Sequence, residues 1–466
     1  MRKKIFRLSD LFLLLGFIPT GIFMLNGFRF METLDASTLF LKPWMMLVLF
    51  FLAVVFWSIY LYLEFSRGNI PQMWITVIFI FVLILSLAGI VLQKNPYTIQ
   101  TLSDGPRHLP PGYDQYATYA DGMVSISLPI SRAHTQFFLL SVILILLFMY
   151  IGFFVFPKRV TTIKPLRFFG YIIFAFVASL MIYSYIAEGS LYGPFLYNLF
   201  YTQGPLSGLK SYILNSNAFG MCLLIGTIFC CINHSIEKKW FYFPLMIIFH
   251  LQMIFTFCRT GLVVTGFIVV SYMIYSIITT FRGHVVRNVI MSILLANTVL
   301  IIISFSFASY LTEGLFIPYL YNALMSFGNT NSLESRFKIW AITIEIMKNN
   351  PLSLIVGEGY GTLNYILFHV CLFKNGWDII PTHNSYLGLL AQGGFSTLLS
   401  YAALLVYSIV LLAKNYRKSP ALLFAINLGV LAFSLYSIIE TIHYLVYGFI
   451  FILLVACGAL NAKKTI

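Results

Sequence analysis

The chain has 466 residues, of which 60% are hydrophobic and only 9% are charged, and its formal net charge is +14. A soluble domain carries about 25% charged residues, so this composition excludes a water-soluble globule of this length and predicts a membrane protein. The six cysteines include no CxxC pair and no zinc-ligand spacing, so we expect no metal site. Cys258 and Cys371 are the two cysteines expected near the outer surface, and we do not expect a disulfide between them.

Twelve apolar runs are each long enough to cross a hydrocarbon core of about 30 Å, which takes roughly 20 residues of helix. In chain order they cover approximately 11–28, 43–63, 71–92, 136–156, 166–187, 213–232, 241–257, 260–280, 288–309, 384–413, 421–439 and 443–460. No small-residue cleavage site closes the first run, so we interpret it as an uncleaved span. The predicted fold is an all-α polytopic membrane protein, with 1–466 forming a single integral membrane domain. Cys258-Arg259-Thr260 interrupts the seventh and eighth runs, which predicts a tight hairpin there.

The distribution of lysine and arginine predicts that both chain ends lie in the cytoplasm. With the N-terminus inside, most of the 29 basic residues fall on the inner side, where the only acids are Asp10, Glu64 and Glu237. The outer side is then close to neutral. The positive charge is therefore a topology signal that anionic lipid head groups can balance, and it calls for no nucleic acid.

The long connections all fall on the predicted outer side, whereas the inner ones are short. They are 93–135, 188–212 and the large loop 310–383, which precedes the tenth span. We therefore expect any chemistry on the outer face.

The large loop has a predicted helix of its own. Asn331 followed by Glu334 is typical of a helix start, and Pro351 ends the segment. A stripe at helical spacing predicts an amphipathic helix lying on the outer interface, formed by Leu333, Phe337, Trp340, Ile344 and Met347. Glu334 and Lys338 are expected to pair along it. The following segment, residues 357–361, is interpreted as a flexible turn, because it lacks the lysine of a phosphate loop.

Three outer residues can carry chemistry, and each also has a plain alternative. Arg259 is the only charge between Lys239 and Arg282, and it either snorkels to lipid or binds a ligand phosphate with its guanidinium fork. Arg336 is either a solvated surface arginine or a phosphate ligand. His383, followed by Asn384, either belongs to a helix cap or acts as a general base, since imidazole accepts a proton near neutral pH.

At this point the chain resembles the O-antigen ligase and O-antigen polymerase superfamily of bacterial surface-polysaccharide enzymes. The resemblance rests on motifs within about 213–410: Asn215-Ser216-Asn217-Ala218, Thr256-Phe257-Cys258-Arg259, Ser335-Arg336-Phe337-Lys338-Ile339-Trp340 with Asn350-Pro351 and Gly357, and His383-Asn384 followed after nine residues by Gly394-Phe395-Ser396-Thr397. One departure is Leu352, which stands where family polymerases often carry glycine.

The resemblance implies a metal-independent, inverting glycosyltransferase in the bacterial cytoplasmic membrane, with no cofactor. Its donor is a glycan on a polyprenyl diphosphate, and its acceptor is another glycan or a lipid. His383 would deprotonate the acceptor, while Arg259 and Arg336 would stabilise the departing diphosphate. Substrate contacts are expected from four further residues, which are Asn384, Asn217, Lys338 and Trp340. A flippase, a chain-length regulator and membrane lipids are the expected partners.

The sequence leaves several functions open. A polymerase would join the repeat units of O-antigen, capsule or exopolysaccharide, and we favour it slightly because nothing in the sequence indicates a lipid A core acceptor. A ligase would transfer the finished chain to lipid A core or another acceptor. A flippase or transporter also suits twelve spans, although its usual intramembrane charges are not evident. A non-catalytic scaffold would lack a cytoplasmic domain through which to signal.

Overall fold

The computed structural model describes most of the predicted membrane segments and parts of the loops. The described residues are 8–33, 42–71, 73–92, 97–102, 115, 117–121, 123–128, 132–160, 162–187, 216–256, 258–280, 331–348, 352–359, 362–375 and 382–461. The chain divides into two compact units, and each is considered by itself below. The first comprises Met1–Val160 and Glu334–Tyr407, and the second comprises Thr161–Leu333 and Ser408–Ile466. The single membrane domain expected from the sequence stays a prediction.

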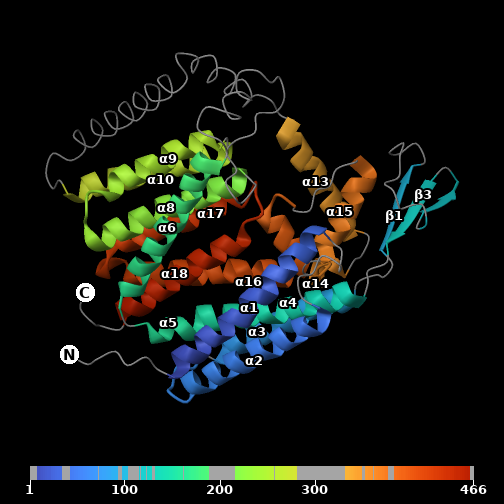
Figure 1. Cartoon of the computed structure of the whole chain (residues 1–466), viewed down its shortest axis with the longest axis horizontal. Coiled ribbons are helices and arrows are strands. Elements are labelled where there is room, and N and C mark those ends of the chain that lie inside the picture. Colours follow the sequence, from blue (N-terminus) through green and yellow to red (C-terminus); the bar gives the residue numbers. More distant parts are fainter. Residues whose placement is uncertain are drawn as a thin grey trace, which may run out of the picture. The chain divides into compact units, whose positions relative to one another are not determined.

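The first unit is built on a bundle of long apolar helices (Figure 1). They are α1 (Leu8–Thr33), α2 (Pro43–Phe65), α3 (Met73–Val91) and α4 (Arg132–Tyr150), the last continuing through the π-helix η3 (Ile151–Val155) into α5 (Phe156–Arg159). Trp57 and Tyr60 of α2 are fully buried in its core, together with Phe23 of α1.

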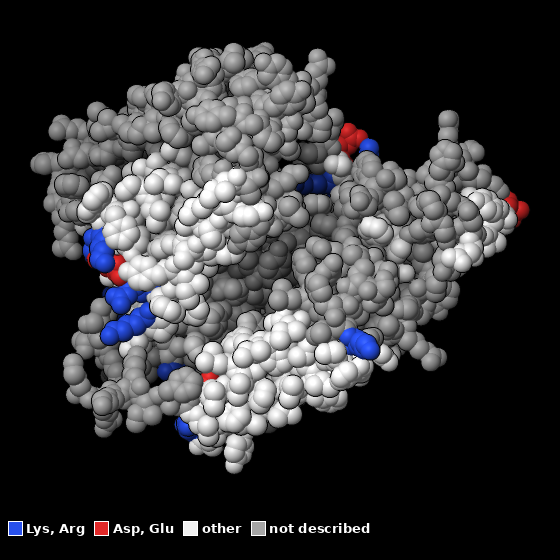
Figure 2. Space-filling view, viewed as in Figure 1, with Lys and Arg blue, Asp and Glu red and all other residues white. Residues whose placement is uncertain are grey.

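The outward faces of this bundle are as apolar as its core. Large side chains of α2 and α3 are exposed, among them Phe51, Val55, Val77, Phe81 and Ile84. Figure 2 shows an almost uncharged surface along these helices, with charged side chains near its ends. In water this exposure would be very unfavourable, because the hydrophobic effect favours burial by about 25 cal/mol per Å². It is the surface expected of helices that face lipid.

An antiparallel sheet follows α3, in the predicted outer loop. Its strands are β1 (Tyr97–Leu102), β2 (Ala117–Ala120) and β3 (Met123–Leu128), in the order β1-β3-β2. Tyr97 pairs with Leu128 at one end of the ladder. These strands were not predicted, although Met-Val-Ser-Ile-Ser-Leu in β3 alternates between apolar and polar residues, as a half-buried strand does. The all-α fold class therefore needs this addition.

The large loop, predicted to lie outside, contributes three helices to the first unit. They are α13 (Asn331–Lys348), α14 (Ser353–Val356) and α15 (Thr362–Asn375), and α16 (Ser385–Asn415) follows the loop. The start of α13 at Asn331 and its end before Pro351 confirm the predicted helix. Neither α14 nor α15 was expected.

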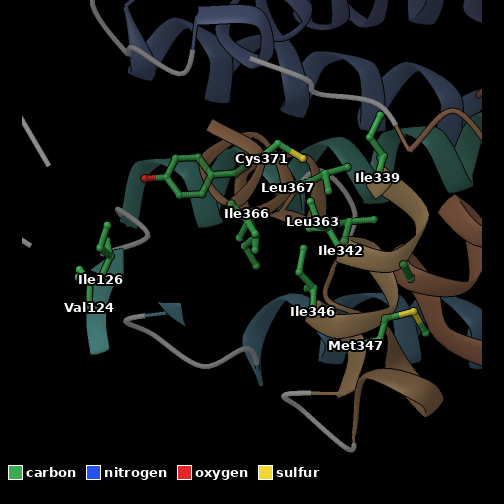
Figure 3. Close-up of a cluster of buried hydrophobic side chains, with 13 residues drawn as sticks. Val124, Ile126, Ile339, Ile342, Ile346, Met347, Leu363, Ile366, Leu367 and Cys371 are labelled. Atoms are coloured by element: carbon green, nitrogen blue, oxygen red, sulfur yellow. The ribbon is translucent and has the colours of Figure 1, made fainter. Parts of the chain in front are cut away.

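One hydrophobic cluster joins these loop helices to the sheet (Figure 3). Val124 and Ile126 of β3 belong to the same cluster as buried side chains of α13 and α15, and so does Ala391 of α16. The two loops that contain residues 97–128 and 331–375 therefore lie on the same side of the first unit.

The second unit is centred on α8 (Ser216–Glu237), in which most residues of the apolar part are buried. Around it pack α6 (Lys164–Ala187), α9 (Tyr242–Phe255), α10 (Arg259–Thr280), α17 (Pro420–Tyr436) and α18 (His443–Asn461). The short 3-10 helix η5 (Tyr416–Lys418) links α16 to α17.

Each predicted span within the described residues corresponds to a helix. The span predicted at 288–309 and the loop at 188–212 lie outside those residues. Seven of the described helices are long and apolar enough to cross a membrane, and five further apolar helices are shorter. The structure thus supports a multi-pass membrane protein, whereas the twelve crossings and their orientation stay predictions.

Ion pairs join helix ends at the predicted cytoplasmic side of the first unit. The fully buried carboxylate of Glu64 accepts hydrogen bonds from Arg67, at 3.0 Å, and from Asn69, at 2.6 Å. Arg159 pairs with Asp10 and lies 3.8 Å from Glu64. The ends of α1, α2 and α5 are therefore tied together by charge.

The corresponding acid of the second unit is Glu237, at the end of α8. Its carboxylate accepts hydrogen bonds from Tyr171, at 2.7 Å, and Tyr242, at 2.8 Å. It also pairs with Arg167, at 3.5 Å, and Lys239, at 3.1 Å. Each of the three acids predicted on the inner side is therefore an internal counter-ion.

Candidate functional site

Arg336 lies on the second turn of α13 and is half-buried. The helix buries Ile339, Ile342 and Ile346 against the first unit. Arg336 precedes Ile339 by three residues, so it lies at the N-terminal end of this packed face. The packing of α13 thereby fixes the backbone from which the guanidinium extends.

The apolar stripe predicted for α13 differs from the face that the protein buries. Phe337 is 53% exposed and Ile344 is 44% exposed, whereas Met347 is buried. Trp340 is half-buried and meets the Phe337 ring edge-on, with centroids 5.2 Å apart. The helix is thus apolar on two sides, one packed in the protein and one uncovered. We predict that the exposed side of α13, with Phe337 and Ile344, lies on lipid.

Lys338 forms the predicted pair with Glu334, at 2.9 Å, and both side chains are more than half exposed. Such an exposed pair contributes at most about 0.5 kcal/mol to stability.

His383 lies at the corner where the chain enters α16. It is half-buried and adopts a positive φ of 49°, a conformation that residues other than glycine rarely take. On one side Thr382 is buried, and its hydroxyl donates to the carbonyl of Asn384 at 3.0 Å. On the other side Asn384 Oδ1 accepts from the backbone N–H of Leu387 at 2.9 Å. The corner is therefore held by hydrogen bonds on both flanks of the histidine.

Asn384 is the N-cap of α16, which is the plain alternative considered for this corner. Its carbonyl accepts from Gly388 N, and its side-chain oxygen accepts from the third helical residue, as in a standard N-cap. A Cβ on Gly388 would lie 2.8 Å from the Thr382 hydroxyl, so the corner packs closely on the first turn. The N-cap role of Asn384 is compatible with a catalytic role for His383, because the cap fixes the backbone next to the histidine.

Residues 357–359, the described part of the predicted flexible turn, are held by backbone hydrogen bonds. Glu358 N donates to the carbonyl of Ala391 at 2.7 Å, and Gly359 N donates to that of Gln392 at 3.0 Å. Both acceptors lie in α16. Gly357 and Gly359 permit a close approach of two chain segments that a Cβ would obstruct.

The hydrophobic cluster links the helices that carry Arg336 and His383. Leu387 and Leu390, one and two turns after His383, pack against the cluster that contains Ile339 of α13. Tyr365 and Phe368 of α15 flank His369, with ring centroids 4.4 and 5.2 Å from it. This aromatic group belongs to a helix that the sequence analysis did not predict.

In the second unit, Arg259 is the first residue of α10. Helix α9 ends at Phe255, so the predicted hairpin is confirmed. Cys258 N donates to the Thr256 hydroxyl at 3.2 Å, and Cys258 O accepts from Leu262 N. The first turn of a helix exposes N–H donors and a partial positive charge, which disfavours a cation there unless an anion binds. An anion could bind at this backbone position, and phosphate binding by Arg259 stays a prediction.

Three helix ends meet near this hairpin. The Cys258 thiol and the Tyr436 hydroxyl of α17 lie 2.8 Å apart, and a Cβ on Gly220 of α8 would lie 2.7 Å from Cys258 Cβ. Asn217, on the first turn of α8, donates to Glu440 at 3.4 Å. Glu440 follows the last turn of α17 and is 7% exposed. The carboxylate thus orients one of the residues predicted to bind substrate.

The cysteines are free thiols, including the buried Cys258 and Cys371. Burial raises the pKa of Cys371, in the predicted outer loop, to about 11. Its thiol is therefore protonated at neutral pH and is a poor nucleophile. Among the residues that the structure describes, no three His, Cys, Asp or Glu side chains group in a way that could hold a metal ion.

The structure places the predicted site residues in two groups. Arg336, His383 and Asn384 belong to the first unit, on helices that share a core, together with Lys338 and Trp340. Arg259 and Asn217 belong to the second unit, where their helix ends converge.

Comparison with protein families finds that residues 244–402 match the O-antigen ligase family. This region runs from α9 to the middle of α16 and includes Arg259, Arg336 and His383. No curated protein and no solved structure matches the chain.

Proposed function

We propose that this chain polymerises lipid-linked glycan repeat units. The match of residues 244–402 to the O-antigen ligase family confirms the resemblance to the ligase and polymerase superfamily. The observation that carries the proposal is the His383 corner. A histidine in a restrained, positive-φ conformation precedes the N-cap of α16, inside the matched region. Such restraint is typical of functional sites.

The donor in this proposal is a glycan on a polyprenyl diphosphate at the outer face of the cytoplasmic membrane. Arg259 begins a helix whose first N–H groups would also donate to a bound anion, and Arg336 extends from the packed helix α13. Charge accumulates on the diphosphate as it departs, so fixed donors at these positions would stabilise the transition state more than the ground state. The lipid diphosphate is itself the leaving group, and no nucleotide is needed.

The reaction then takes one displacement step. His383 accepts the proton of an acceptor hydroxyl as that oxygen bonds to the anomeric carbon. The bond between the anomeric carbon and the diphosphate oxygen breaks, and the electron pair leaves with the diphosphate. Attack from the opposite face inverts the anomeric configuration. The proton on His383 afterwards passes to solvent.

Substitutions of His383 and Arg259 should distinguish the proposed base and phosphate-binding roles from purely structural roles. His383→Ala should lower glycan transfer by about 10²–10⁴-fold, the usual contribution of a general base. Arg259→Lys should also lower it strongly, because an ammonium cannot form the bidentate fork. The control is Arg417→Lys at an exposed inner position, which should leave transfer unchanged. Full activity of Arg259→Lys would make Arg259 a lipid anchor.

The size of the surface glycan after gene deletion decides among the alternatives. Single-repeat products indicate a polymerase, as we expect. Long chains that remain on the lipid carrier indicate a ligase, the second candidate, which the family match equally permits. Unchanged glycan with altered solute uptake would indicate a transporter and contradict the proposal.

A further inference from the structure

Helix α16 is broken ten residues after Asn384. Gly394 has φ 67° and ψ −171°, so the helix is two segments joined at this residue. The hydroxyls of Ser396 and Thr397 donate to the carbonyl of Gly393, at 3.0 and 2.9 Å. The first segment, Ser385–Gly393, is therefore a separate short rod with His383 at its entrance.

The turn Gly357–Gly359 docks on the last residues of this rod. Its N–H groups at Glu358 and Gly359 donate to Ala391 and Gln392, as described above. A Cβ on Gly357, which has φ 76°, would overlap the backbone of Gln392. A Cβ on Gly394 would overlap the carbonyl of Ile355. Backbone thus contacts backbone on both sides of the break, and no side chain fits between.

Helix α3 holds the turn from its other side. A Cβ on Gly89 would overlap the carbonyl of Val356, and a Cβ on Gly359 would lie 2.8 Å from Ile90 Cγ1. The turn is therefore wedged between α3, in the helical bundle, and the break in α16. It connects the rod that follows His383 to a rigid part of the first unit.

Polar side chains are buried at this junction. Glu358 is 1% exposed, Thr362 is 1% exposed and Gln392 is 6% exposed. Burying such groups costs free energy that apolar side chains would not cost. Packing alone therefore does not account for the sequence of this junction.

We propose that the turn Gly357–Gly359 is a positioning clamp for His383. The inference rests on the proposed role of His383 as the base. The rod is anchored at one end by the Asn384 cap and at the other by the clamp. A displaced turn shifts the rod and moves the imidazole relative to the acceptor hydroxyl. Misplacement of a reacting group by about 1 Å can lower a rate about 10²-fold.

Gly394→Ala tests the clamp, because its Cβ would push the two backbones apart. In membranes that contain equal amounts of protein, we expect kcat to fall about 10²-fold while KM for the lipid-linked donor stays unchanged. Gly68→Ala is a matched control, since Gly68 has φ 80° but open space around it. Gly448→Ala, with neither constraint, is the second control. Activity of Gly394→Ala equal to that of Gly68→Ala, or a loss confined to KM, would overturn the clamp.

A double variant separates positioning from a general effect on the fold. If the clamp acts only through His383, adding Gly394→Ala to His383→Ala should not lower the residual rate further. Multiplied losses would show a role unrelated to His383 and overturn the inference while leaving the base intact. Full activity of His383→Ala would instead defeat the proposed function. If Gly394→Ala does not accumulate, Gly359→Ala, which meets the Ile90 side chain, takes its place in the same cycle with the same expected result.

Discussion

At the scale of single residues, Asn384 shows how one side chain can serve two purposes. Its Oδ1 accepts a hydrogen bond from Leu387 N, one of the N–H groups at the start of α16 that lack a partner within the helix. This oxygen is therefore used by the fold. The amide nitrogen is the group through which it would contact a sugar hydroxyl. The sequence allowed a cap and a substrate ligand as alternatives, and the structure assigns the cap to one atom.

Substitution of Asn384 should distinguish the two purposes. Asn384→Ala removes the cap and should lower the free energy of unfolding by about 1 kcal/mol. Asn384→Asp keeps an oxygen for the cap, so stability should stay within a few tenths of a kcal/mol, yet it lacks the amide donor and should transfer glycan more slowly. Thermal unfolding in detergent and a transfer assay measure the two effects. Wild-type activity in Asn384→Asp would leave Asn384 as a cap alone.

At the scale of helices, ion pairs fix the positions of helix ends relative to one another, which apolar packing alone does not do. Along α2 the core contacts are non-directional, because any apolar neighbour serves. Glu64, at the end of this helix, is fully buried and has fixed partners in Arg67, Asn69 and Arg159. A buried carboxylate requires such partners, so this group sets the register of α2 against the end of α5.

Glu64→Gln should therefore destabilise the protein much more than an exposed change of the same kind. Breaking a buried ion pair costs about 3–5 kcal/mol, because the partner charge stays buried. Glu334→Gln, which breaks the exposed pair with Lys338, should cost at most about 0.5 kcal/mol. Unfolding midpoints of the two variants in one detergent give the comparison. Equal midpoints would show that the Glu64 cluster contributes nothing to stability.

At the scale of the whole molecule, the sheet gives the first unit a direction. Helix α3 runs from the turn after Glu64 to β1, so the ion cluster and the sheet lie at opposite ends of it. Its 19 residues span about 28 Å, close to the thickness of a hydrocarbon core. Since β3, α13 and α15 contribute to one hydrophobic cluster, the sheet end also carries the described helices of the large loop.

Accessibility of introduced cysteines tests this arrangement. Thr118→Cys and Glu334→Cys, both at exposed positions, should react with an impermeant maleimide from outside the cell. Lys239→Cys should react only after permeabilisation, because it lies on the predicted inner side. The native thiols, which are buried apart from the half-buried Cys222, give a low background. Labelling of Thr118→Cys and Glu334→Cys from opposite sides would contradict the hydrophobic cluster that the sheet shares with α13 and α15.

The sequence by itself determined the membrane class, the long apolar helices within the described residues and the hairpin at Arg259. These follow from apolar length and from local breaks, which depend only on neighbours in the chain. It also located the helix that carries Arg336 and the histidine motif, because those signals are local too.

Only the tertiary structure decided the features that depend on distant partners. The apolar residues of β3 are buried in a cluster that includes side chains of α13 and α15, and the buried face of α13 is determined by what packs there. In the sequence Gly394 is only a motif residue, and Gly357 and Gly359 predict a flexible turn, because a missing Cβ permits both mobility and close approach. The opposing backbones of Ala391 and Ile355 show that here it permits close approach, and no local pattern contains that information.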